Sequence, residues 1–247
     1  MSANLFELSK NVLSPGLINK IAEFTGEDTL NIKSAVDMSL PAVVGSLSVR
    51  ISNGKGASEI MKLIRDGGFD GNILKNTDNS FSDHAKFNAV IDNAAGSMGF
   101  LFKNKLKDLT NLISKKTGIS QKSAASLTGI LTAVVMSLTG KQLLSDNLNS
   151  RSLATFLSEQ KTNLSGLVPS DVAGILSIES VNNIYAPLDQ FNEYSDNKNQ
   201  SGSGKFKPWL LIAICAALLF ILWRSCGTDK PPAPKKSENV KTDSISN

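Results

Sequence analysis

Apolar residues recur at helical spacing along most of the first 165 residues, separated by short polar or glycine-rich breaks. The first clear helix begins after Ser14, which is a favoured capping residue, and has Pro15 at its first position. Gly26 ends it, as glycine commonly does after the last helical turn. Its apolar stripe consists of Leu17, Ile18, Ile21 and Phe24.

The next predicted helix covers residues 27–39. Pro41 follows and either kinks this helix or starts a third one, since proline removes a helical hydrogen bond. The apolar face beyond the proline is Val43, Val44, Leu47 and Ile51. A loop is predicted over residues 52–56 and a short helix over residues 57–66.

Residues 75–86 are mostly polar, and the pattern predicts that they are the least ordered part of the domain. One long amphipathic segment then runs from about residue 87 to residue 115.

Residues 17–47 resemble residues 109–138 in sequence, which indicates an internal duplication of a helical unit. Ile21 and Gly26 align with Ile113 and Gly118. After a one-residue shift, Ala42, Val43, Ser46 and Leu47 align with Ala133, Val134, Ser137 and Leu138. One such unit cannot bury its apolar face alone, whereas two units can cover each other. Chance similarity between helices rich in small and aliphatic residues is the alternative.

A run of 16 uncharged, mostly apolar residues ends at Trp223, and Trp209 lies near its start. The cations just outside the run are Lys205, Lys207 and Arg224. Tryptophans at the ends and cations beyond them are typical of a membrane-spanning helix. The run spans about 24 Å against a hydrocarbon core of about 30 Å, so the bilayer would have to thin locally. A buried core helix is the alternative.

Charge divides the chain near the same place. The first 200 residues carry 19 basic and 19 acidic side chains, whereas residues 201–247 carry 7 and 3, which accounts for the net charge of +4. Positive charge beside an anchor fits contact with lipid headgroups. The two cysteines, Cys215 and Cys226, cannot form a disulfide framework for the N-terminal region.

The first residues lack a basic stretch followed by a continuous apolar one, so we expect no secretory signal. The expected organisation is an all-α, multi-helix domain at residues 1–197, a flexible linker at 198–207, a single transmembrane helix at 208–224 and a disordered tail at 225–247. The expected location is a bacterial cytoplasmic membrane, with the N-terminal domain in the cytoplasm and the tail outside.

Three stretches together resemble a known bacterial family. They are LFELSKNVLSPGLINKIAEFTGE near the start, LPAVVGSLS at residues 40–48 and LIRDGGFDGNIL at residues 63–74. They are similar to the DUF937, or YidB-like, domain, in the form that some bacteria place before a transmembrane helix. The resemblance covers residues 4 to about 165. It implies an all-α fold that is partly homeodomain-like, and it implies no established activity.

In long relatives of that kind the tail leads into an OmpA-like domain that binds peptidoglycan. The present sequence has no such domain before Asn247, so cell-wall binding is not carried over. A truncated chain and a shortened relative would both have this appearance.

Catalytic constellations are not evident in the sequence. His84 is the only histidine, which excludes a cluster of histidine ligands and makes a Ser-His-Asp triad improbable. An exposed histidine is the expected state of this residue. No spacing pairs the carboxylates into an acid and a base. We therefore expect neither enzymatic activity nor a cofactor or metal.

The segment 109–130 approximates the spacing of a helix-turn-helix, with Gly118 at the turn. The side chains that would contact nucleic acid are Lys115, Lys116, Ser120, Gln121 and Lys122. A packed helical hairpin with a solvated lysine face is the alternative, and the neutral charge of the domain favours it.

Three functions remain open at this stage. A membrane-tethered interaction or scaffold module with an unknown protein partner is preferred, because the sequence supplies a core and an anchor but no chemistry. A membrane-tethered nucleic-acid binder comes second. An enzyme comes third, and a pocket lined by converging polar groups would revive it.

Overall fold

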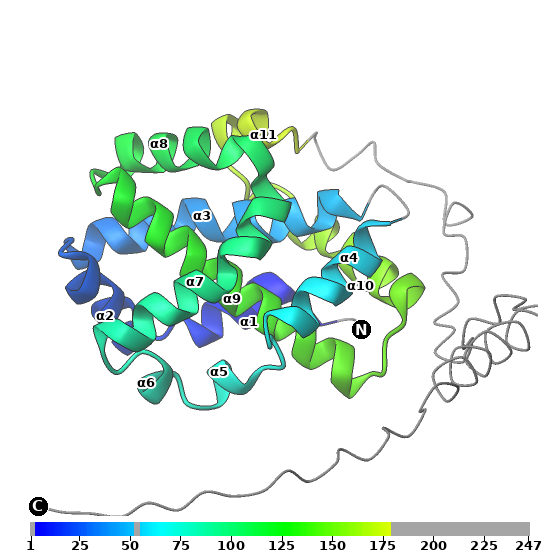
Figure 1. The fold of residues 1–247 in the computed structure, drawn as a ribbon. Coiled ribbons are helices and arrows are strands. Elements are labelled where there is room, and N and C mark those ends of the chain that lie inside the picture. The colour runs from blue at the N-terminus through cyan, green and yellow to red at the C-terminus, as the bar shows by residue number, and fades with distance from the viewer. Residues whose placement is uncertain (1–2, 52–54, 179–247) are drawn as a thin grey trace, which may run out of the picture. The chain divides into compact units, whose positions relative to one another are not determined.

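A computed structural model describes residues 3–51 and 55–178 (Figure 1). Every regular element in these residues is helical, which confirms the all-α class. The elements are α1 (Leu5–Val12), α2 (Pro15–Thr25), α3 (Thr29–Arg50), α4 (Gly56–Asp66), α5 (Asn72–Lys75), α6 (Thr77–Ser80), α7 (His84–Phe102), the 3-10 turn η1 (Lys103–Lys105), α8 (Leu106–Thr117), α9 (Gln121–Ser145), α10 (Ser150–Asn163) and α11 (Ser170–Leu176).

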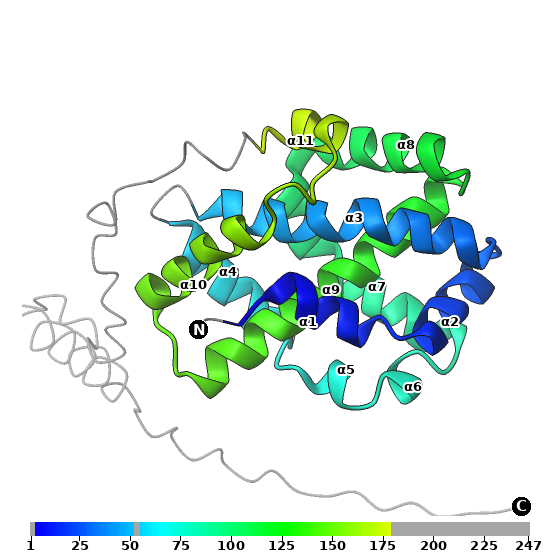
Figure 2. The ribbon, with the colours of Figure 1, turned by 180° about the vertical axis from the view of Figure 1, so that it is seen from behind.

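The two longest helices, α3 and α9, form the centre of the described domain. Every residue of α9 from Leu127 to Gly140 is buried, as is every residue of α3 from Ser39 to Ser48. A helix that is apolar on all sides is stable in water only when other elements enclose it. Figure 1 shows α7 in front of this pair, and Figure 2, from behind, shows α1 and α10 in front of it.

Both central helices are long and apolar enough to cross a membrane by composition alone. However, 72% of the most apolar window of α3 and 89% of that of α9 are buried inside the domain. Their apolar surfaces therefore face the domain's own core.

The N-terminal segment is attached to α10 by one buried side chain, Gln160. Its amide oxygen accepts a hydrogen bond from the Leu5 backbone amide at 2.9 Å, and its amide nitrogen donates to the Ala3 carbonyl, also at 2.9 Å. Because every polar atom of this buried amide has a partner, Gln160 holds the start of α1 without an unsatisfied group.

The segments α2–α3 and α8–α9 share a sequence of elements and local geometry. Each has a short helix, a left-handed glycine and a long buried helix; the glycines are Gly26 (φ 70°) and Gly118 (φ 79°). Thr25 bonds through its hydroxyl to the Ile21 carbonyl at 2.6 Å, and Thr117 bonds to Ile113 at 2.8 Å. Ser48 and Thr139 make a second such pair of bonds, four residues back in each long helix.

Pro41 neither ends a helix nor starts one, because α3 continues through it from Thr29 to Arg50. Of the two alternatives at the proline, the separate third helix is therefore wrong. Burial of the whole segment around Pro41 offsets the hydrogen bond that the proline cannot donate.

The segment 75–86, which the sequence predicts to be the least ordered part of the domain, contains local structure and one core residue. It contains α6, and Phe81 is 1% exposed in the core. Lys20 forms an ion pair with Asp78 at 3.2 Å, which attaches this segment to α2. One buried aromatic residue orders a stretch whose composition is otherwise polar.

The long amphipathic segment expected from residue 87 to residue 115 is two helices. Lys103, with φ 50° and ψ −130°, turns the chain between α7 and α8. Both helices pack on α9, so apolar residues continue at helical spacing through this corner. The break between α7 and α8 is therefore not visible in the sequence pattern.

The predicted linker, transmembrane helix and tail lie outside the described residues. The same holds for the predicted membrane-interface side chains Trp209, Trp223, Lys205, Lys207 and Arg224.

Candidate functional site

The two glycine turns of the domain lie against each other. The Glu27 carboxylate, from the first turn, accepts a hydrogen bond of 2.8 Å from the backbone amide of Ser120, the residue that caps α9. Ser123 donates through its hydroxyl to the Thr25 carbonyl at 3.4 Å. One half of the domain thus supplies acceptors to the start of the long helix of the other half.

Hydrogen bonds stabilise the ionised form of the Glu27 carboxylate. The Ser123 hydroxyl has the largest effect and lowers the pKa of Glu27; burial opposes it, and hydrogen bonds from Ser120 add a smaller lowering. A carboxylate at the first turn of a helix also interacts favourably with the helix dipole. No sequence pattern indicates this contact, because its partners are 93 residues apart.

The side chains predicted to contact nucleic acid gather around the second turn. Lys115, Gln121 and Lys122 are exposed. Ser120 is the cap of α9, where its hydroxyl accepts a bond from the Ser123 amide at 3.1 Å. Lys116 pairs with Asp171 of α11 at 3.0 Å, and this bond lowers the pKa of Asp171.

The helix that would enter a DNA groove is α9, and it presents little surface. Beyond Lys122, Ser123 and Ala124 are buried, and burial is continuous from Leu127 to Gly140. A recognition helix needs several exposed side chains along one face to reach base edges. The geometry of this hairpin matches the packed alternative.

Residues 103–122 nevertheless carry six lysines and one acidic residue, Asp108. We call these lysines the lysine edge: Lys103, Lys105, Lys107, Lys115, Lys116 and Lys122. Lys105 is half-buried and the other five are exposed. Among the residues that the structure describes, Lys116 is the one member of the edge with an ion-pair partner.

Another cationic side chain, Arg50, has a structural role. Its guanidinium, at the end of α3, donates from Nε to the Leu101 carbonyl at 2.8 Å. Burial lowers the pKa of Arg50. A cation at the last turn of α7 satisfies a carbonyl that the helix itself leaves unpaired.

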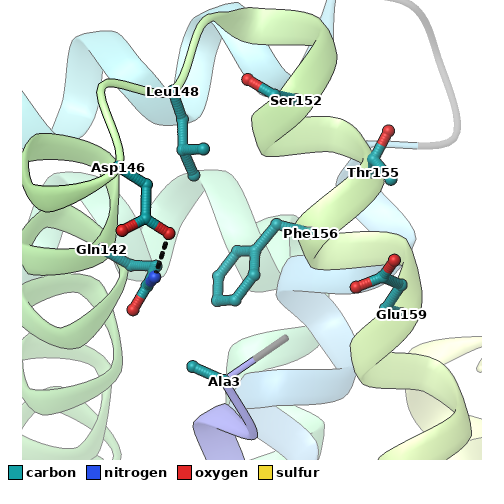
Figure 3. A pocket seen from close by; sticks show the side chains of 8 residues that line it. All are labelled: Ala3, Gln142, Asp146, Leu148, Ser152, Thr155, Phe156 and Glu159. Atoms are coloured by element: carbon teal, nitrogen blue, oxygen red, sulfur yellow. Dashed lines mark hydrogen bonds between the residues drawn. The ribbon is translucent and has the colours of Figure 1, made fainter. Parts of the chain in front are cut away.

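A surface pocket of about 310 Å³ lies between the N-terminal segment, the end of α9 and α10 (Figure 3). Its lining consists of Ala3, Gln142, Asp146, Leu148, Ser152, Thr155, Phe156 and Glu159. Figure 3 shows the Phe156 ring pointing into the space between α9 and α10.

The pocket lacks the features of a catalytic site. Its two carboxylates, Asp146 and Glu159, are both exposed. Asp146 accepts hydrogen bonds from Gln142 and, at 2.9 Å, from the Ser145 hydroxyl, so local contacts occupy it. A catalytic acid and base are usually buried in a cleft, whereas both of these carboxylates are exposed to solvent.

His84 lies at the start of α7 with its ring 4.5 Å from that of Phe24, and it is exposed as expected. Within residues 3–51 and 55–178, no three His, Cys, Asp or Glu side chains are grouped so that they could hold a metal ion.

Comparison with known proteins places the chain in a family. No curated protein and no solved structure matches it. A family model described as a bacterial protein of unknown function, DUF937, matches residues 7–142, which is more than half of the chain. These residues run from α1 through most of α9 and include both glycine turns. The chain belongs to the DUF937 family of bacterial proteins of unknown function.

Proposed function

We propose that this protein is a membrane-tethered helical interaction module of the bacterial envelope, without catalytic activity. The observation that carries the proposal is the run from Trp209 to Trp223, with a tryptophan at each end and cations beyond. The apolar surfaces of the central helices α3 and α9 are mostly buried within the domain, so neither helix is proposed as the membrane anchor.

The partners we propose are the lipid bilayer and a protein that binds the helical domain. The location is the cytoplasmic membrane, with the domain in the cytoplasm and the tail outside.

We also infer that the domain arose by duplication of a helical unit. The paired left-handed glycines and the equivalent threonine bonds of Thr25 and Thr117 support this inference beyond sequence similarity. Each long helix packs against the other, which is how two units that are unstable alone can form one core.

Nucleic-acid binding through the segment 109–130 is the second candidate. The number of lysines near the turn favours it, and the burial of α9 argues against it. A Lys115→Glu and Lys116→Glu double variant would abolish a salt-sensitive gel shift if this candidate is correct.

Flotation of full-length protein with pure phosphatidylcholine vesicles tests the proposed tether. A Leu218→Asp and Leu219→Asp variant places two charges in the middle of the run, at about 2.5–3.5 kcal/mol each, so it should no longer float with the vesicles. The matched control is Ser201→Asp with Ser203→Asp, outside the run, which should float like the wild type. Equal flotation of both variants would refute the tether.

A further inference from the structure

The lysine edge lies along the outer border of the domain. Helix α8 turns Leu109, Thr110, Ile113 and Thr117 into the core, which leaves its opposite side to solvent. Figures 1 and 2 show α8 and α11 at the top of the domain in both views, with α5 and α6 at the bottom. The lysines at both ends of α8 are therefore presented on one border of the domain.

The charge on this border is unusual for the domain as a whole. The first 200 residues are neutral in sum, yet residues 103–122 carry six lysines and one acidic residue, and the two carboxylates that reach this stretch from elsewhere, Asp171 and Glu27, leave it net positive. Among the described residues, Lys116 is the one lysine of the edge with an ion-pair partner, Asp171 at 3.0 Å. Unpaired cations gathered on one border produce a local positive potential that attracts an anionic partner.

The backbone at the corner of this border is strained. Lys103 has φ 50°, in the region that favours glycine, although it carries a long charged side chain. A residue other than glycine costs free energy in this conformation, and such positions gather at functional sites. The strained corner places an exposed lysine at the start of the border, next to Lys105.

A nucleic acid and an anionic bilayer both carry the required negative charge, and the arrangement of α8 and α9 favours one of them. A nucleic acid read by a helix-turn-helix needs the start of α9 in its groove, and beyond Lys122 this part of the helix offers little surface, since Ala125 and Ser126 are half-buried and residues 127–140 are buried. A bilayer surface needs no inserted helix; it needs cations spread along one border that can lie flat against phosphate headgroups. We propose that the lysine edge docks the domain on an anionic lipid surface.

This inference rests on the proposed function, because the anchor is what holds the domain beside the bilayer. The 29 residues between Ile178 and Pro208 reach about 100 Å at full extension, so the covalent connection alone does not select the side that faces the lipid. The lysine edge would select it, because a tethered second contact benefits from a high effective concentration.

The test uses full-length protein in lipid nanodiscs, with Cys215 and Cys226 replaced by serine. A fluorescent label is attached to Asn104→Cys on the lysine edge or to Ser82→Cys at the opposite border, and the lipids carry a quencher on the headgroup. The label at position 104 should be quenched severalfold more in nanodiscs containing phosphatidylglycerol than in pure phosphatidylcholine. High salt should remove the difference, and the label at position 82 should not respond.

Two charge variants make the test specific. Lys107→Glu with Lys115→Glu should abolish the lipid-dependent quenching, whereas Lys62→Glu with Lys75→Glu, an equal charge change on α4 and α5, should retain it. All four side chains are exposed, so the variants should fold, and circular dichroism checks this.

The outcomes separate the two proposals. Failure of the protein to enter nanodiscs refutes the tether itself. Entry without quenching at position 104, or quenching that is the same in both lipids, overturns the docking surface alone. Salt-sensitive binding of duplex DNA by the lysine edge, without lipid-dependent quenching, would also overturn it and would identify nucleic acid as the partner.

Discussion

At the scale of single residues, Glu27 joins the two halves of the domain through the amide of Ser120. The equivalent position in the second half is Ile119, which is buried. Sequence alignment of the two halves therefore shows an acidic residue where an apolar one is expected, and the structure gives the reason: the carboxylate caps the neighbouring long helix. A residue that departs from a repeat pattern is informative when its partner is far away in the chain, and pattern analysis alone does not identify that partner.

Replacing Glu27 with Gln should destabilise the domain by about 0.5–1 kcal/mol at pH 7, because a neutral acceptor replaces a charged one. Hydrogen bonds lower the folded-state pKa of Glu27, so its contribution is present above the ordinary glutamate value of 4.5 and is lost as pH falls through the lowered pKa. Urea unfolding at pH 7 and at progressively lower pH measures the difference. Glu23→Gln, at an exposed site on α2, is the control. A difference between wild type and Glu27→Gln that stays constant with pH would contradict this account.

At the scale of elements, the start and end of α2 are predictable because they depend on local chemistry. Ser14 caps the helix through a 3.3 Å bond to the Leu17 amide, and Gly26 ends it. The continuation of α3 through Pro41 and the break at Lys103 are not predictable in this way. Both depend on burial against distant helices, which overrides local preference.

The packing of α9 gives a prediction at the same scale. A Cβ atom added at Gly140 would lie 1.7 Å from the Phe69 carbonyl oxygen, so Gly140→Ala must push α9 away from the turn after α4. We expect a loss of about 2–3 kcal/mol in unfolding free energy. Gly99, on α7, has no atom within 4 Å of an added Cβ, so Gly99→Ala should stabilise the helix by up to about 1 kcal/mol. Thermal unfolding of both variants checks this, and an unchanged or higher melting temperature of Gly140→Ala would refute the close approach at Gly140.

At the scale of the whole molecule, the helical class and the family could be predicted from the sequence, because apolar residues recur at helical spacing and the three stretches that resemble the family overlap the region that its model matches. The candidate site could be predicted only in part. The cluster of lysines is visible in the sequence. The burial of α9 beside these exposed lysines is not, because it depends on how the two halves of the domain pack. The burial of α9 matches the interpretation that the neutral charge of the domain favours, a packed hairpin with a solvated lysine face.

The most direct measurement of the tether is alkaline extraction of membranes that contain the full-length wild-type protein. High pH strips proteins held by charge or by partners, whereas a helix inserted in the hydrocarbon core stays. If the run from Trp209 to Trp223 spans the bilayer, nearly all of the protein should remain in the membrane pellet. Recovery of most of the protein in the alkaline supernatant would contradict the central claim.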